Sequence, residues 1–116
     1  MQIQVNTDDN ITGDESLSSY VEGEVSRAIG RFEDRITRVE VHLGDENAGK
    51  SGAHDKRCLI EVRPARRDPI AVTEYAATVR AAVTGATKKL RKLLDSSLGR
   101  DADHKGGETI RQFAPD

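Results

Sequence analysis

The chain has 116 residues, of which 35% are hydrophobic, 3% aromatic and 33% charged. This length suits one two-layer domain and excludes two independent ones, and the thin aliphatic composition favours a sheet covered on one face only. We expect a soluble cytoplasmic protein, because the sequence has no basic leader before an apolar run, no stretch near the roughly 20 apolar residues that cross a bilayer, and no second cysteine to pair with Cys58.

The formal net charge of −2 conceals a segregated pattern of charge. Residues 1–24 carry six acids and no base, residues 56–67 carry five bases against one acid, and residues 77–95 carry five bases against Asp95 alone. An acidic pI of 5.9 usually argues against a nucleic-acid partner. Because an electrostatic field acts locally, the two basic clusters could still bind phosphates if the fold brings them together.

The first part of the chain predicts a strand followed by a helix. Residues 2–6 alternate polar and apolar, which is typical of a strand with one buried face. Thr12 and Glu15 have the spacing of a capping box, so a helix should begin there. Its apolar stripe spans about five turns: Leu17, Tyr20, Val21, Val25, Ala28, Ile29 and Phe32.

The middle of the chain predicts three strands. From Ile36 the apolar period returns to two, with Val39, Val41 and Leu43 pointing inward. Residues 44–55 contain almost nothing that could be buried, which predicts a long mobile hairpin loop. A third strand over 57–63 should direct Cys58, Ile60 and Val62 inward. A fourth begins at Pro69, and because proline cannot donate to a ladder we expect an edge strand.

A second helix should begin after Thr73 as its N-cap and run to about Ser96. Its apolar stripe comprises Val79, Ala82, Val83, Ala86, Leu90, Leu93 and Leu94. The opposite side carries Arg80, Thr84, Thr87, Lys88, Arg91 and Lys92. The polar, glycine-punctuated remainder predicts a flexible tail over 99–116, which leaves a single domain over 1–98.

This order of elements predicts an α+β fold, a two-layer β-α-β-β-β-α domain with a four-stranded mixed sheet and two helices packed on one face. The first two strands should pair in parallel and the last three should form an antiparallel meander. The other face of the sheet should be open to water. It would present Gln2, Gln4, Arg38, Glu40, His42, Arg57, Leu59, Glu61, Arg63 and Thr73.

The basic face of the last helix is the strongest candidate for a binding site. A bland interpretation is a solvated surface, but no acid lies between these bases, and Lys88 and Arg91 lack glutamate partners at i,i+4. Unpaired cations on a rigid face suit phosphate contact. The candidate RNA-binding residues are Arg80, Lys88, Lys89, Arg91 and Lys92, together with Lys56, Arg57, Arg63, Arg66 and Arg67 if the turn after the third strand lies near one end of this helix. Recognition of single strands by base stacking is not expected, because aromatic residues are scarce: Tyr20 and Phe32 are assigned to the core stripe of the first helix, Tyr75 to that of the last helix, and Phe113 lies in the tail.

Residues that could support catalysis are scattered through the sequence. Cys58 lies on the inward phase of its strand, His42 points outward, and His54 and His104 fall in a loop and in the tail. We find no metal-ligand spacing, no phosphate-binding loop and no serine in a nucleophile turn. The sequence therefore predicts a protein that is not an enzyme and has no cofactor, metal or small-molecule substrate.

Three segments carry a family resemblance. They are the opening Met-Gln-Ile-Gln-Val, the run from Phe32 to Val41, and Tyr75-Ala76-Ala77 opening a last helix that ends in residues 88–92. In this order and spacing, the sequence resembles the bacterial ribosome hibernation-promoting factors and ribosome-associated inhibitors, also called sigma-54 modulation proteins, over residues 1 to about 96. It resembles a short, diverged member, whose last helix has Leu93-Leu94-Asp95 where the family usually continues with lysines.

The resemblance implies a protein that sits on the small ribosomal subunit near the decoding region and occludes messenger and transfer RNA during stationary phase or starvation. By position, it implies ribosomal RNA contacts for Lys88, Lys89, Arg91, Lys92 and Arg80. Two alternatives remain open from the residues themselves. One is a protein-interaction module on the same fold, and the other is a generic binder of double-stranded RNA, since such domains also set two helices against one sheet.

Overall fold

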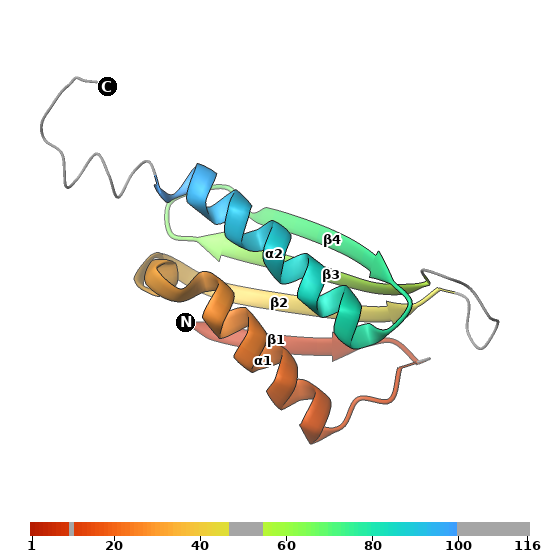
Figure 1. Cartoon of the computed structure of the whole chain (residues 1–116). Coiled ribbons are helices and arrows are strands. Elements are labelled where there is room, and N and C mark those ends of the chain that lie inside the picture. Colours follow the sequence, from red (N-terminus) through yellow and green to blue (C-terminus); the bar gives the residue numbers. More distant parts are fainter. Residues whose placement is uncertain (10, 47–54, 100–116) are drawn as a thin grey trace, which may run out of the picture.

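Two helices cover one face of a four-stranded sheet in the computed structural model (Figure 1), which describes residues 1–9, 11–46 and 55–99. The elements are β1 (Gln2–Thr7), α1 (Glu15–Ile29), the 3₁₀ helix η1 (Gly30–Arg35), β2 (Ile36–Asp45), β3 (Lys56–Pro64), β4 (Ile70–Ala76) and α2 (Val79–Ser97). The predicted α+β fold, with its β-α-β-β-β-α order, is confirmed.

The strands lie in the spatial order β1-β2-β3-β4. Strand β1 pairs in parallel with β2, and β2, β3 and β4 pair antiparallel in succession. The predicted meander is therefore correct, and so is the prediction that β4 lies at an edge. In the register of β2 and β3, Glu40 lies opposite Glu61 and Val41 lies opposite Ile60, so each face of the sheet receives alternate residues of both strands.

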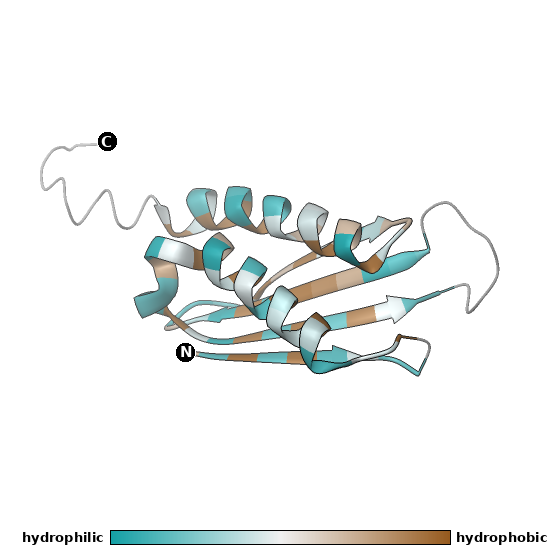
Figure 2. Ribbon diagram, turned by 60° about the horizontal axis from the view of Figure 1, so that its bottom comes forward, coloured by the Kyte–Doolittle hydropathy of each residue, from teal (hydrophilic) through white to brown (hydrophobic). Residues whose placement is uncertain are grey.

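The core lies between the sheet and the two helices. Figure 2 shows hydrophobic segments on the strands and on the sides of the helices that face them. The inward residues predicted for β2 and β3 are buried, and so are the central residues of both helical stripes. The fully or almost fully buried side chains include Val21, Val25, Ile29, Val39, Val41, Leu43, Cys58, Ile60, Val62, Val83, Leu90 and Leu94. Burial of each large aliphatic side chain contributes about 1.5–3 kcal/mol, which fixes the helices to the sheet.

Helix α1 begins and ends at residues other than those predicted. Its N-cap is Asp14, not Thr12, and the Asp14 carboxylate accepts a hydrogen bond of 2.8 Å from the Leu17 amide. A carboxylate at this end is also favoured by the helix dipole. The α-helix ends at Ile29 because Gly30 adopts a φ of 31°. Phe32 is still buried, but as part of η1.

Helix α2 begins five residues later than predicted. Thr73 lies within β4, and Thr78 is the N-cap, with its hydroxyl accepting a 3.0 Å hydrogen bond from the Ala81 amide. The reason lies in the neighbouring strand. Thr73, Glu74 and Tyr75 pair with Leu59, Cys58 and Arg57, and without them the first half of β3 would lose its backbone partners on that side.

Two smaller expectations also change. Thr87 was assigned to the solvent side of α2 but is buried, and its hydroxyl donates to the Thr84 carbonyl at 2.9 Å. Gly44 and Asp45 belong to β2, so they are not part of the hairpin loop. Most of that loop and of the expected tail, residues 47–54 and 100–116, lie outside the described residues. No helix in the described ranges has the length and apolarity needed to cross a membrane.

Candidate nucleic-acid interface

Helix α2 presents a row of cations on the side away from the sheet. We call Arg80, Lys88, Lys89, Arg91 and Lys92 the α2 basic face. All five are exposed, while the opposite side of the helix is fully buried at Ala82, Val83, Ala86, Leu90 and Leu94. Because the buried stripe fixes the rotation of the helix, the charges are held at a defined position on the surface.

Three members of the α2 basic face have neither an acidic nor an aromatic partner in the described part of the chain: Lys88, Arg91 and Lys92. Lys89 differs, because its ammonium lies 2.8 Å from Glu74 Oε1 and donates a 2.7 Å hydrogen bond to the Thr73 carbonyl. Lys89 therefore connects the helix to edge strand β4, and the three free cations supply most of the uncompensated positive charge.

Gly85 makes the Lys89 contact possible. A Cβ built at Gly85 would lie 2.6 Å from both Cγ and Oε2 of Glu74. The absence of a side chain thus lets Glu74 lie beneath the helix and reach a lysine one turn further along. The glycine in the middle of α2 therefore has a packing role, although it costs about 1 kcal/mol in helix propensity relative to alanine.

Arg80 sits at the other end of the face, against the first helix. Its guanidinium carbon lies 4.3 Å from the centroid of the Tyr20 ring, a cation–π contact that orients the planar group. The Tyr20 hydroxyl lies 3.5 Å from the Thr84 hydroxyl. The aromatic ring of α1 therefore positions a cation of α2.

The turn between β3 and β4 adds two further arginines near the end of α2. Arg66 has a φ of 65°, in the left-handed region, and with Arg67 it lines a shallow hollow of about 400 Å³ that also involves Asp68, Ile70 and Ser97. Ser97 is the last residue of α2. The expectation that this turn lies near one end of the helix is confirmed by this geometry.

Lys56 and Arg57 do not join that surface, because they lie at the opposite end of β3. The Lys56 ammonium is 2.8 Å from Asp55 and 3.5 Å from Asp45, and a guanidinium nitrogen of Arg57 is 3.5 Å from Glu46. Hydrogen bonding to Asp55 is the main cause that raises the pKa of Lys56. These two cations are largely neutralised by neighbouring acids.

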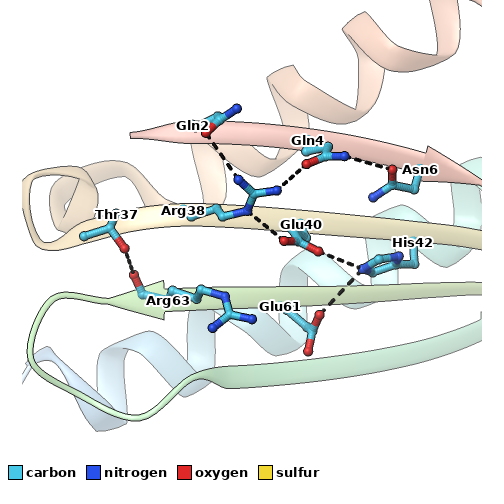
Figure 3. Close-up of polar contacts among 9 residues, drawn as sticks. All are labelled: Gln2, Gln4, Asn6, Thr37, Arg38, Glu40, His42, Glu61 and Arg63. Atoms are coloured by element: carbon cyan, nitrogen blue, oxygen red, sulfur yellow. Dashed lines mark hydrogen bonds and ion pairs between the residues drawn. The ribbon is translucent and has the colours of Figure 1, made fainter.

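Arg63 is on the open face of the sheet rather than beside α2 (Figure 3), so it too lies apart from the α2 basic face. Its backbone carbonyl accepts a 2.9 Å hydrogen bond from the Thr37 hydroxyl. The predicted set of ten basic residues is therefore spatially divided. Arg66 and Arg67 accompany the helix, whereas Lys56, Arg57 and Arg63 belong to other surfaces.

Two arginines that the sequence did not single out lie beside α2. Arg31 is 3.1 Å from Asp95, the acid that ends the basic run of α2, and the Arg35 guanidinium donates a 2.9 Å hydrogen bond to the Leu98 carbonyl. Arg31 thus compensates the one acid among residues 77–95. The spacing of Arg27, Arg31 and Arg35 at intervals of four was the available signal.

Two side chains bear on competing functions. Tyr75 was assigned to the core of the last helix, but it lies on β4 and is 46% exposed, so one aromatic side chain is available at the surface.

Cys58 is fully buried, as expected, and burial raises the pKa of its thiol to about 12. At neutral pH the thiol is protonated and therefore a poor nucleophile.

The open face of the sheet carries a connected polar network (Figure 3). The Arg38 guanidinium donates to Gln4, to Gln2 at 3.4 Å and to Glu40 Oε2 at 2.7 Å. Beyond it, Glu40, His42 and Glu61 direct donor atoms toward one another. This grouping was missed in the sequence because its members come from two strands and are up to 21 positions apart.

Comparison with known proteins agrees with this architecture. The family described as Sigma 54 modulation protein / S30EA ribosomal protein matches residues 3–100. The N-terminal domain of Protein Y from Thermus thermophilus aligns with a TM-score of 0.67 and 25% identity over 83% of this chain and 98% of that one.

A structure from Coxiella burnetii, titled a ribosomal subunit interface protein, has a TM-score of 0.71 over 85% of this chain and 99% of that one. At 16% identity this likeness shows the fold alone. A search among curated proteins finds no match. From the family match and the shared fold we conclude that the chain belongs to the sigma-54 modulation protein / S30EA ribosomal protein family.

Proposed function

We propose that this chain is a non-enzymatic, cytoplasmic translation inhibitor that binds the small ribosomal subunit. The α2 basic face, with Arg66 and Arg67, contacts ribosomal RNA near the decoding region when growth stops. Membership over residues 3–100 in a family described as Sigma 54 modulation protein / S30EA ribosomal protein supports a ribosomal partner. The charge distribution supports RNA as the component that is contacted.

The observation that carries this proposal is the set of free cations Lys88, Arg91 and Lys92. They stand exposed on a helix whose other side is fully buried. An exposed cation that already has a carboxylate partner must lose it to bind phosphate, whereas these three need only release solvent counterions. A rigid row of such cations fixes a protein on a phosphate backbone without reading the base sequence.

Arg66 and Arg67 extend this surface past the end of the helix, beside Ser97. Lys56, Arg57 and Arg63 make smaller contributions, because the first two are neutralised by acids and the third lies on the open sheet face. The proposed interface therefore follows α2 and the β3–β4 turn.

Co-sedimentation with purified small subunits at low salt tests the proposal. Lys88→Glu, Arg91→Glu and Lys92→Glu should each weaken binding roughly tenfold, because each replaces a phosphate contact with repulsion. Arg27→Glu is a matched control with the same charge change on α1, where Glu24 is the ion-pair partner of Arg27 among the described residues. Unchanged co-sedimentation of all three α2 variants would exclude the α2 basic face as the ribosome contact.

A second candidate function is favoured by one observation, the exposure of Tyr75 on edge strand β4. An edge strand with an exposed aromatic can bind a protein partner by strand addition. In that case Tyr75→Ala would abolish the recovery from cell lysate of a protein partner whose binding is insensitive to salt. The α2 variants Lys88→Glu, Arg91→Glu and Lys92→Glu would still recover that partner. Binding to an arbitrary RNA duplex as tightly as to ribosomes would instead indicate a generic double-stranded RNA binder.

A further inference from the structure

The centre of the open sheet face holds three metal-ligating side chains that the proposed ribosomal role does not use. His42 Nε2 lies 3.4 Å from Glu40 Oε1 and 3.6 Å from Glu61 Oε1. One donor atom from each residue falls within 4.8 Å of the other two. The group lies on the face opposite the helices, so it is separate from the α2 basic face (Figure 3).

We propose that Glu40, His42 and Glu61 form a binding site for a divalent transition-metal ion, and that Zn²⁺ is the ion that fits best.

The distances between the donor atoms support a metal better than they support hydrogen bonds. An N–H···O hydrogen bond spans 2.7–3.2 Å, and both contacts of His42 Nε2 are longer than this. Ligand atoms that bind zinc at about 2.1 Å in a tetrahedral arrangement lie about 3.4 Å from one another. The two contacts of His42 Nε2 therefore already have nearly the spacing of ligands in a zinc coordination sphere, and all three donor atoms lie within 4.8 Å of one another.

The backbone holds the three residues in a fixed relation. Glu40 and His42 are two positions apart on β2, so their side chains leave the same face, and Glu61 lies directly opposite Glu40 on β3. Both strands are central in the sheet and hydrogen-bonded on each side. Ligands on such a scaffold need little reorganisation to bind an ion.

The position of the two glutamates also favours a bound cation. Like charges directly opposite each other on antiparallel strands destabilise a sheet. Here Glu40 and Glu61 are such a pair, and both are partly buried, with exposed side-chain fractions of 23% and 36%. Glu40 already has Arg38 as a partner, whereas His42 is the ion-pair partner of Glu61 in the described part of the chain, so a dication between the two carboxylates would relieve the remaining repulsion.

A neighbouring group orients one of the ligands. Arg38 donates a 2.7 Å hydrogen bond to Glu40 Oε2, which leaves Oε1 directed at His42. Arg38 is itself anchored by Gln2 and Gln4 of β1. Metal-binding carboxylates are commonly held by such hydrogen bonds from an outer layer of residues.

The donor set narrows the choice of metal. One imidazole nitrogen and two carboxylates suit zinc and its neighbours, whereas magnesium and calcium prefer oxygen ligands throughout. Three protein ligands leave at least one coordination position for solvent. The site is therefore expected to prefer Zn²⁺ or Co²⁺ over Mg²⁺.

Calorimetric titration of the full chain with Zn²⁺ tests the inference. We expect one saturable site, at least tenfold weaker binding for both His42→Ala and the isosteric Glu61→Gln, and no effect of His54→Ala or His104→Ala, which remove the other two histidines in the sequence. Circular dichroism of each variant verifies folding. Co²⁺ should give a visible absorption spectrum without a sulfur charge-transfer band, and the His42 ring signals of the unmodified protein should shift on adding Zn²⁺.

Two results would overturn the inference. One is the absence of a saturable site together with unshifted His42 signals, which would leave the cluster as an ion-pair network only. The other is Zn²⁺ binding that survives His42→Ala and Glu61→Gln but is lost in His54→Ala or His104→Ala. An excess of Mg²⁺ that displaces Zn²⁺ would contradict the assignment of the metal class.

Discussion

Lys88 and Lys89 are adjacent lysines on α2 with different surroundings. Lys89 is held by Glu74 and by the Thr73 carbonyl, whereas Lys88 is free of acids in the described part of the chain. We expect Lys89→Glu to lower the free energy of unfolding by up to about 1 kcal/mol, since it sets two carboxylates together at a partly exposed position. Lys88→Glu should have almost no effect. Urea denaturation of both variants measures the difference, and equal midpoints would contradict the Lys89–Glu74 contact.

Cys58 should be nearly unreactive in the folded protein. Burial raises the pKa of its thiol from 9.0 to about 12, so at pH 8 the thiolate fraction is about a thousandfold smaller than in the unfolded chain. Labelling with a thiol reagent should therefore be about a thousandfold slower in buffer than in concentrated guanidinium chloride. Labelling at similar rates in both would show that the thiol is accessible.

Lys56 should stabilise the fold in a way that depends on pH. Its pKa is raised above the ordinary 10.5, chiefly by hydrogen bonding to Asp55. A raised pKa means that the contribution to stability is fully present below pH 10.5 and is lost as the pH rises through the folded-state pKa. Lys56→Met should thus lower the denaturation midpoint at neutral pH, and its difference from the unmodified protein should narrow above pH 10.5. A difference that stays constant up to pH 12 would contradict this account.

At the scale of elements, the N-cap of α2 gives a direct test of where the helix begins. Thr78→Ala removes the hydroxyl that accepts from the Ala81 amide and should cost about 1 kcal/mol in the free energy of unfolding. Thr12→Ala is the control, since Thr12 caps no helix in the structure. If Thr12→Ala costs more than Thr78→Ala in thermal or urea denaturation, the observed caps are wrong.

The sequence predicted the elements better than it predicted their ends. Periodicity identified all four strands and both α-helices, because alternation and helical spacing are local properties. The start of α2 was wrong for a reason that is not local. Thr73 and Glu74 have acceptable capping chemistry, but Leu59 and Cys58 on β3 require them as strand partners. The start of α1 was wrong because two capping residues, Thr12 and Asp14, compete within three positions.

At the scale of the whole molecule, topology decides which predicted site residues can act together. Seven of the ten predicted basic residues lie on α2 or in the β3–β4 turn, and the fold brings the turn next to Ser97, the last residue of α2. Lys56 is the first residue of β3, and Arg66 follows the end of the same strand. Because an extended strand holds its two ends far apart, these two cations cannot share one surface. The Glu40, His42 and Glu61 group was not predictable from spacing, because it depends on the register between β2 and β3.

The salt dependence of small-subunit binding tests the central claim most directly. The logarithm of the association constant should fall linearly with the logarithm of the salt concentration, with a slope of about 0.7–0.9 per phosphate contact. Combining Lys88→Gln, Arg91→Gln and Lys92→Gln should make this slope shallower by about two to three, because three phosphate contacts are removed. A slope identical to that of the unmodified protein would contradict the proposal that the α2 basic face binds ribosomal RNA.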